Sequence, residues 1–260
     1  MDSPRKSLGQ HWLEDQPTLE SICHAAELSK SDTVLEIGPG KGSLTSWLMK
    51  QAGQVVAVEL DEQLVVQLSA MFGDKNLAVV NEDILRFDFS LLPTGYKVVA
   101  NIPYYLTSNL LRTLSESTNP PTLMVLLVQK EVAERLAAAP GQMSILGISV
   151  QLYYETTLGQ VVPAHLFTPP PKVDSRVVIL RRRTRVLFEN LDSQLFFRLV
   201  KAGFAARRKK LRSSLSAGLN LDKKETERLL ENAGIDPNLR AQDLSLQDWH
   251  RLSQACQAKR

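Results

Sequence analysis

The chain has 260 residues, of which 43% are hydrophobic and 23% charged, with a formal net charge of +3. This is the composition of a soluble globular protein, and the length allows one large domain or a domain with a smaller companion. No apolar run approaches the roughly 20 residues of a membrane span, the first residues lack the apolar core of a secretory signal, and Cys23 and Cys256 lie far apart. These features argue against a membrane span, a disulfide framework and a structural zinc site, and we expect a monomer in the reducing cytoplasm.

The charge is unevenly divided. Residues 1–180 carry 13 Lys and Arg against 19 Asp and Glu, whereas residues 181–260 carry 18 against 9. Much of the excess lies in two clusters, "RRRTR" at 181–185 and "ARRKKLR" at 206–212. Such clusters are either solvated helix faces or a footprint for nucleic acid, and two of them in one segment favour a polyanionic partner.

In chain order, a helical pattern at residues 15–28 is followed by strands and helices in alternation. Runs rich in Val, Ile and Leu predict strands buried on both faces, at 33–38, 55–60, 77–83, 97–103 and 122–129. Apolar residues at three- and four-residue spacing predict helices at 42–51, 61–72, 107–117 and 130–140. This alternation predicts an α/β fold with a doubly wound parallel sheet, followed by a late pair of strands at 148–158 and 175–183.

The pattern changes near residue 190. Helical periodicity without strand-like runs covers 193–218, 223–234 and 245–257, and Gly218 and Gly234 lie where helix C-caps are expected. We therefore predict two domains, an α/β domain at 1–185 and a small all-α domain at 190–260.

A glycine-rich turn follows the first predicted strand of the sheet. "VLEIGPGKGSLT" places Gly38, Gly40 and Gly42 in the spacing G-x-G-x-G. Glycines allow a backbone to approach a ligand closely, and open α/β sheets bind ligands at the carboxyl ends of their strands. The spacing departs from the G-x-G-x-x-G of dinucleotide binding and suits a sulfonium cofactor that has no pyrophosphate. For the glycines alone, a tight turn without a ligand is the alternative.

Acidic residues end the next two predicted strands. Glu59 follows Gly38 by 21 residues, where a carboxylate can accept both hydroxyls of a ribose. In "NEDIL", Asp83 can accept from an adenine amine, and Ile84 can donate its N–H and pack on the ring. Helix N-capping is the plainer explanation, but Asp61 can cap the following helix, which leaves Glu59 for a ligand.

The fourth predicted strand ends in "NIPYY". An adenine N6 amine is a poor nucleophile unless acceptors hold its two N–H bonds, and Asn101 Oδ1 and the Ile102 carbonyl can do this. Pro103 fixes the direction of that carbonyl, and Tyr104 offers a face on which an extruded base can stack. A turn alone explains Asn101 and Pro103 but leaves Tyr104 unexplained. For Tyr105 we expect core packing.

Eight motifs occur in one order along nearly the whole chain: SLGQHWL, EIGPGKGSLT, VVAVELD, NEDIL, NIPYYLTS, VLLVQKEVAERL, FTPPPKVDS and KAGFAARRKKLRSSL. Together they resemble the ribosomal RNA adenine N6,N6-dimethyltransferase family, and most of all its bacterial 16S type, associated with kasugamycin sensitivity. The resemblance implies a Rossmann-like class I methyltransferase with a small all-α C-terminal RNA-binding domain, and S-adenosylmethionine as the methyl donor. It also implies dimethylation of two adjacent adenosines in the 3′-terminal hairpin loop of 16S rRNA, within an immature 30S subunit.

The resemblance implies two sets of site residues, the basic clusters supply a third, and no metal site is expected because no ligand spacing is present. Those implied to contact the cofactor are Gln10, His11, Leu13, Gly38, Gly40, Glu59, Leu60, Asp83, Ile84 and Asn101. Those implied at the target base are Asn101, Ile102, Pro103, Tyr104 and Phe167, with Phe167 opposite Tyr104. Those expected to hold RNA are Arg181, Arg182, Arg183, Arg207, Arg208, Lys209, Lys210 and Arg212. Two positions depart from the usual pattern, His11 in place of Asn and Trp12 in place of Phe.

Three other functions compete with this interpretation. An erythromycin-resistance-type methylase shares the chemistry but acts on 23S rRNA, and "FTPPPKVDS" and "RRKKLRSSL" favour the 16S type over it. A non-catalytic RNA-binding or ribosome-assembly factor could use the same scaffold, although Asn101 and Tyr104 are intact. A nicotinamide oxidoreductase is disfavoured by the glycine spacing.

Overall fold

The computed structural model describes residues 10–73 and 76–258, which form two compact units. The first contains the chain up to Glu134 together with Tyr154–Arg182, and the second contains Arg135–Tyr153 together with the chain from Arg183. The chain therefore passes between the units three times, whereas the sequence indicated a single passage between 185 and 190. Each unit is described by itself.

The first unit is built on a seven-stranded sheet in the order β4-β3-β2-β5-β6-β9-β7. Its strands are β2 (Thr33–Ile37), β3 (Gln54–Glu59), β4 (Leu77–Asn81), β5 (Lys97–Asn101), β6 (Leu123–Gln129), β7 (Tyr154–Val162) and β9 (Ser175–Arg182). Strands β2 to β6 are parallel, and β9 is antiparallel to both β6 and β7. The predicted doubly wound α/β fold is confirmed, and its strand order reverses between β2 and β5, where such sheets bind ligands.

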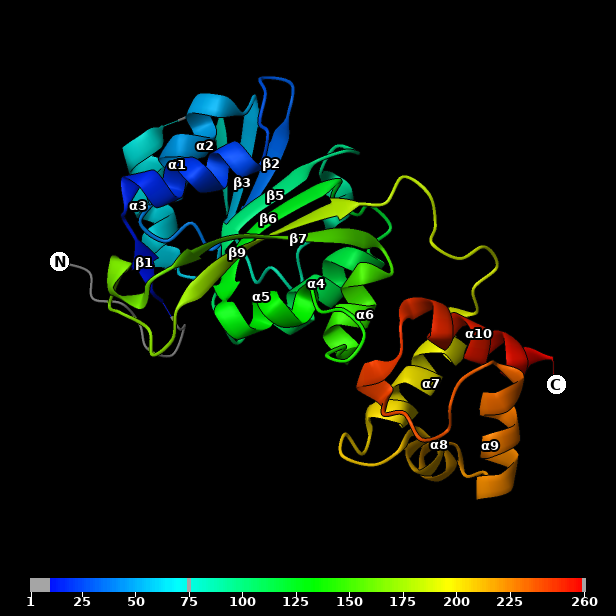
Figure 1. The fold of residues 1–260 in the computed structure, drawn as a ribbon. Helices are drawn as coiled ribbons and strands as arrows, with labels where there is room; N and C mark the ends of the chain where they lie inside the picture. Colours follow the sequence, from blue (N-terminus) through cyan, green and yellow to red (C-terminus); the bar gives the residue numbers. More distant parts are fainter. Residues whose placement is uncertain (1–9, 74–75, 259–260) are drawn as a thin grey trace. The chain divides into compact units, whose positions relative to one another are not determined.

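Helices cover both faces of this sheet. Figure 1 shows α1 (Gln16–Ala25), α2 (Ser43–Gln51) and α3 (Glu62–Phe72) on one side, and α4 (Thr107–Glu116) and α5 (Lys130–Leu136) on the other. Asp15 and Asp61 cap α1 and α3 by accepting from the backbone N–H groups of Thr18 and Gln63. Short 3₁₀ turns, η2 (Phe89–Leu91) and η3 (Ala164–Leu166), complete the connections.

A two-stranded sheet that the sequence did not indicate joins distant segments of this unit. Strand β1 (Trp12–Leu13) pairs antiparallel with β8 (Phe167–Thr168), so that Leu13 lies opposite Phe167. Two-residue strands carry no readable periodicity, because alternation needs at least four residues to register. The pairing brings the segment that contains Trp12 and Leu13 against the start of "FTPPPKVDS".

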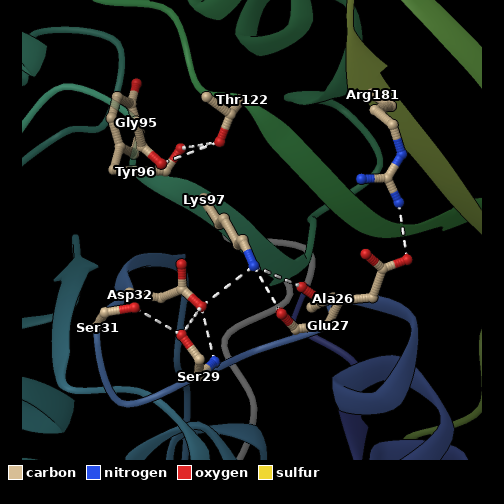
Figure 2. Close-up of polar contacts among 10 residues, drawn as sticks. All are labelled: Ala26, Glu27, Ser29, Ser31, Asp32, Gly95, Tyr96, Lys97, Thr122 and Arg181. Carbon is tan, nitrogen blue, oxygen red and sulfur yellow. Dashed lines mark hydrogen bonds and ion pairs between the residues drawn. The ribbon is translucent and has the colours of Figure 1, made fainter.

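A half-buried lysine ties the start of β5 to the end of α1 (Figure 2). Lys97 Nζ donates to the carbonyl oxygens of Ala26 at 3.2 Å and Glu27 at 2.7 Å, and pairs with Asp32 at 3.1 Å. The ammonium thus caps carbonyls at a helix C-terminus that the helix leaves free. Nearby, Arg181 pairs with the Glu27 carboxylate at 2.8 Å.

The second unit is helical, with α6 (Ile145–Gln151), α7 (Ser193–Phe204), α8 (Leu211–Leu219), α9 (Lys223–Asn232), η4 (Ala241–Asp243) and α10 (Leu246–Gln257). Its apolar core surrounds the fully buried Trp249 and Phe196. Ser245 begins α10 with a capping box to Asp248.

The structure corrects three local expectations. Residues 148–151 form the end of α6 instead of a strand, because Ser144 caps that helix and only the residues from Tyr154 join the sheet. Gly218 lies inside α8, where a Cβ would come within 2.7 Å of Ala202 Cβ, so it permits close helix packing instead of capping. The expected helix 193–218 is interrupted by a turn at 205–210. Gly234, with φ of +67°, does end α9 as predicted.

Candidate active site

A cavity of about 260 Å³ lies at the carboxyl ends of the parallel strands in the first unit. It is lined by all ten residues predicted to contact a cofactor: Gln10, His11, Leu13, Gly38, Gly40, Glu59, Leu60, Asp83, Ile84 and Asn101. Ile102, Pro103, Tyr104 and Phe167 line it as well. Residues predicted from separate motifs therefore converge on one site.

The glycine loop forms one wall of the cavity and is shaped by its neighbours. Gly40 and Gly42 adopt φ of +59° and +84°, a region that side chains disfavour. A Cβ on Gly40 would lie 3.1 Å from Trp12 Cδ1, so the loop packs directly against the indole. Lys41 Nζ lies 4.1 Å from the centre of the same ring, in a cation–π contact.

Glu59 is already engaged with the backbone around it. Its Oε1 accepts from the N–H groups of Leu60 at 2.9 Å and Asp61 at 3.0 Å, and its Oε2 accepts from Gly40 at 3.2 Å. Burial raises the pKa of Glu59, and these hydrogen bonds oppose the rise. A carboxylate has about four acceptor positions, so capacity remains for a ligand hydroxyl. Asp61 caps α3, as expected.

Glu36 is a site residue that the sequence reasoning missed. It lies on β2, is only 1% exposed and lines the cavity, and its Oε2 has no hydrogen-bond partner among the described residues. Burial raises the pKa of Glu36 to about 8; the Thr45 hydroxyl works against the rise and the Glu59 charge adds to it. The sequence feature that could have indicated Glu36 is its position as an acidic residue inside the apolar strand run "TVLEI". Without a cation this buried carboxyl keeps its proton at neutral pH, and a positively charged ligand placed beside it would favour the carboxylate and pair with it.

At the end of β4, Asp83 forms a turn and Ile84 packs inward. Asp83 Oδ1 accepts from the Leu85 N–H at 3.0 Å, and Ile84 is 5% exposed. Asn81, which was not predicted, donates from Nδ2 to the Glu59 carbonyl at 3.0 Å. It thereby fixes the end of β3 relative to the end of β4.

Asn101 is held by its amide nitrogen. Nδ2 donates to the His11 carbonyl at 3.0 Å, which defines the orientation of the amide because a carbonyl oxygen can only accept. Oδ1 is thereby identified as the atom available to a donor. Ile102 donates its N–H to the Leu127 carbonyl at 3.1 Å, and Leu106 N–H closes a turn on the Pro103 carbonyl at 3.0 Å.

The aromatic residues meet at the same end of the cavity. The rings of His11 and Tyr104 stack with centroids 5.8 Å apart and an interplanar angle of 26°, and His11 Nδ1–H donates to the Pro169 carbonyl at 2.7 Å. Phe167 is only 3% exposed and packs with Leu13 in an apolar cluster. Its predicted contact with a base requires that ring to be uncovered, and the assignment stays a prediction.

Tyr105 does not pack in the core, and that expectation is wrong. Its side chain is 62% exposed and lines the mouth of the cavity, as does Leu60 at 51%. Exposed large apolar side chains gathered at one cavity mouth are typical of a surface that a ligand or partner covers.

The predicted RNA-binding arginines of the first cluster have partners inside the protein. Arg181 lies opposite Leu123 in the sheet, at the amino ends of the parallel strands and away from the cavity. Arg182 Nη1 donates to the Ser115 carbonyl at 3.4 Å, and in the second unit Arg183 Nε donates to the Gln151 carbonyl at 3.1 Å.

The side chains of the second basic cluster are more exposed to solvent than those of the first. Residues 207–210 are exposed on the turn that leads into α8, and Lys210 Nζ donates to Asn238 Oδ1 at 2.9 Å. Arg212, at the start of α8, pairs with Glu227 at 2.7 Å. The turn therefore presents four consecutive exposed basic side chains.

The described part of the chain contains neither a metal-binding cluster nor a membrane-spanning helix. Residues 10–73 and 76–258 contain no group of three or more His, Cys, Asp or Glu side chains arranged to hold a metal ion. Within the same ranges, no helix is long and apolar enough to cross a membrane.

The parallel sheet with its late antiparallel strand, and the cavity at the strand ends, define a class I methyltransferase fold. The chain matches the ribosomal RNA adenine dimethylase family over residues 1–258, and it belongs to that family.

Individual relatives agree with this assignment. The ribosomal RNA small subunit methyltransferase A of Dehalococcoides mccartyi (strain CBDB1) is 44% identical over 252 residues, covering 95% of this chain and 87% of the relative. That of Streptococcus thermophilus (strain ATCC BAA-491 / LMD-9) is 40% identical over 264 residues, covering 96% and 91%.

Two solved structures share the fold over nearly the whole chain. A dimethyladenosine transferase from Plasmodium falciparum superposes with a TM-score of 0.79 at 28% identity, covering 93% of this chain and 96% of the other. The 23S rRNA methyltransferase ErmE gives a TM-score of 0.76 at 29% identity, covering 94% and 98%.

Proposed function

We propose that this protein transfers methyl groups from S-adenosylmethionine to N6 of two adjacent adenosines in the 3′-terminal hairpin loop of 16S rRNA. Four transfers per RNA, within an immature 30S subunit, complete the reaction. The observation that carries the proposal is the orientation of Asn101 in the cavity. Asn101 Nδ2 donates a hydrogen bond to the His11 carbonyl, and Oδ1 is the atom presented to a donor.

The cavity is chemically suited to S-adenosylmethionine. The buried, partnerless Oε2 of Glu36 favours a cationic ligand, and the glycine loop admits a close backbone approach. In the proposed arrangement Gly38 borders the methionine end, Glu59 holds the ribose, and Asp83 and Ile84 hold the adenine. When bound, S-adenosylmethionine supplies an electrophilic methyl group on a sulfonium.

This chain's residues prepare the target amine for that group. The N6 lone pair of adenine is delocalised into the ring, so in the first transfer to each adenosine acceptors must hold both N–H bonds for the lone pair to turn outward. In the second transfer a single N–H is left to be held. Asn101 Oδ1 is one acceptor and the Ile102 carbonyl the other, while Tyr104 stacks on the extruded base. The new N–C bond forms as the S–C bond of the donor breaks, and the amine then releases one proton to solvent. A strong general base is not required.

RNA binding is assigned chiefly to the turn at 207–210. Phosphate contacts position an RNA without specifying its sequence, and exposed Arg and Lys side chains supply them. Arg212 and Arg181 to Arg183 belong to the same proposal, but each has a partner inside the protein, so we expect them to contribute less than the turn.

The experiment that tests the proposal measures transfer of tritiated methyl groups from S-adenosylmethionine to ribosomal subunits. The full chain is incubated with 30S particles from cells that lack this modification, and the product RNA is mapped by mass spectrometry. We expect two adjacent dimethylated adenosines near the 3′ end. Absence of transfer to these particles, with S-adenosylhomocysteine still bound, would instead support a non-catalytic assembly factor.

The structural similarity to ErmE, a 23S rRNA methyltransferase, makes 23S rRNA the alternative substrate. An enzyme of that type would modify an adenine of 23S rRNA. Reverse-transcription stops on RNA from treated 50S and 30S particles separate the two substrates. Stops confined to 23S rRNA would overturn the 16S assignment and leave the chemistry unchanged.

A further inference from the structure

Ser175 contacts Tyr104 from a distant part of the chain. Its Oγ lies 2.9 Å from the Tyr104 hydroxyl, in hydrogen-bond geometry. Ser175 is fully buried at the start of β9, where it lies opposite Gln129 of β6 and Val162 of β7. Its position is thus fixed by two neighbouring strands, and nothing in the proposed reaction has yet used it.

The Tyr104 ring is held at two places. Ser175 holds the hydroxyl at its tip, and His11 stacks against one face at 5.8 Å. His11 is itself fixed by its hydrogen bond to the Pro169 carbonyl. Tyr104 also lines the cavity.

The bond to Ser175 has no role in the chemistry of stacking, because stacking uses the face of the ring and not its hydroxyl. What the bond can do is fix the orientation of the ring before the base arrives. An ordered side chain does not have to lose rotational freedom when the substrate binds, and a fixed ring keeps the base in line for reaction.

We propose that Ser175 is a positioning residue that holds the Tyr104 ring in the plane that receives the target adenine. The inference rests on the proposed function, since it presumes that a base stacks on Tyr104. Ser175 acts only through Tyr104, so removing either hydroxyl should have the same consequence.

The test is a double-mutant cycle measured on the full chain. Ser175→Ala and Tyr104→Phe each remove the same hydrogen bond, from opposite ends, and the double variant removes nothing more. Single-turnover transfer from tritiated S-adenosylmethionine to unmethylated 30S particles gives the rate, and calorimetric titration with S-adenosylhomocysteine gives the cofactor affinity. Ser115→Ala and Tyr96→Phe are matched controls, because both hydroxyls are buried in the same unit without a partner among the described residues.

We expect each single variant to slow transfer roughly three- to tenfold, the range that corresponds to ordering one side chain. The double variant should be no slower than either single variant, and S-adenosylhomocysteine affinity should stay at the wild-type value. The two control variants should transfer at the wild-type rate.

Three results would overturn the proposal. These are wild-type rates for both single variants, additive losses in the double variant, or a loss of S-adenosylhomocysteine affinity parallel to the loss of rate in Ser175→Ala. If Ser175→Ala does not fold, Tyr104→Phe decides alone, because a wild-type rate there shows that the hydroxyl contact is dispensable. If the wild type itself binds S-adenosylhomocysteine but transfers nothing, the proposed function fails and this inference fails with it.

Discussion

Replacing Glu36 by Gln should change how the stability of the protein depends on pH. The carboxyl is 1% exposed, and burial raises its pKa from 4.5 to about 8. The folded state therefore holds this proton more tightly than the unfolded state does. Stability from this group is fully present below about pH 4.5, declines as pH rises, and is lost above about pH 8.

The size of the effect follows from the shift. At 1.36 kcal/mol per pKa unit, the wild type should lose about 1.4 kcal/mol of unfolding free energy per pH unit between these limits, and about 5 kcal/mol in all. Glu36→Gln removes the titration and keeps the shape of the side chain. The difference between the two unfolding free energies should therefore shift in favour of the variant as pH rises.

Urea unfolding of both proteins without added cofactor, at about pH 5, 6, 7 and 8, measures this difference directly. Glu20→Gln, an exposed change on α1, is the control and should leave the pH dependence parallel to that of the wild type. If unfolding free energy depends on pH in the same way for Glu36→Gln and the wild type across the whole range, the Glu36 carboxyl does not stay protonated in the folded state as inferred.

Three further predictions concern packing and RNA. Lys97→Met leaves two helix-end carbonyls without their donor and should lower the unfolding free energy by about 3 kcal/mol. The control Arg112→Met removes an exposed ion pair and should change the unfolding free energy by less than about 0.5 kcal/mol. Urea unfolding measures both values. Gly218→Val pushes side-chain atoms of α8 into Ala202 of α7 and should lower the unfolding free energy by about 1–3 kcal/mol, again measured by urea unfolding. An unchanged unfolding free energy would show that the two helices can move apart freely. Reversing the four charges at 207–210 should weaken RNA binding and make the negative slope of log K against log salt shallower by about 3, with S-adenosylhomocysteine affinity unchanged. An equal loss of both affinities would indicate a structural role.

The arrangement of the sheet could be predicted because buried parallel strands are continuous apolar runs separated by helices of regular period. The five strands from residue 33 to residue 129 lie where the pattern placed them, with ends shifted by a residue or two. The cavity could be predicted for a related reason. Gly38, Glu59 and Asp83 lie at or just after the ends of successive strands, and the carboxyl ends of parallel strands meet at one edge.

Other features depend on contacts that no local pattern encodes. Glu36 lies within an apolar run, and only the packing around it reveals a buried acid. The pairing of β1 with β8 involves two residues on each side, too few for a period. Ser175 and Tyr104 are 71 positions apart, so their contact appears only once β9 is placed beside β6.

The exposure of the Tyr105 ring could not be predicted from the sequence for a different reason. The apolar strand before it favoured core packing for this ring, and the ring lies at the mouth of a cavity instead. Its side chain follows the turn closed by the hydrogen bond from Leu106 N–H to the Pro103 carbonyl. Turn geometry set by a single backbone bond is difficult to read from composition.

In the proposed mechanism, Asn101 presents its side-chain oxygen to the N6 amine of the target adenine. Single-turnover methyl transfer to unmethylated 30S particles by Asn101→Ala tests it most directly, with Asn109→Ala, an exposed change on α4, as the matched control. We predict that Asn101→Ala folds and binds S-adenosylhomocysteine but transfers roughly 100-fold more slowly or worse, because one essential acceptor is gone. Transfer at the wild-type rate by Asn101→Ala would contradict the account.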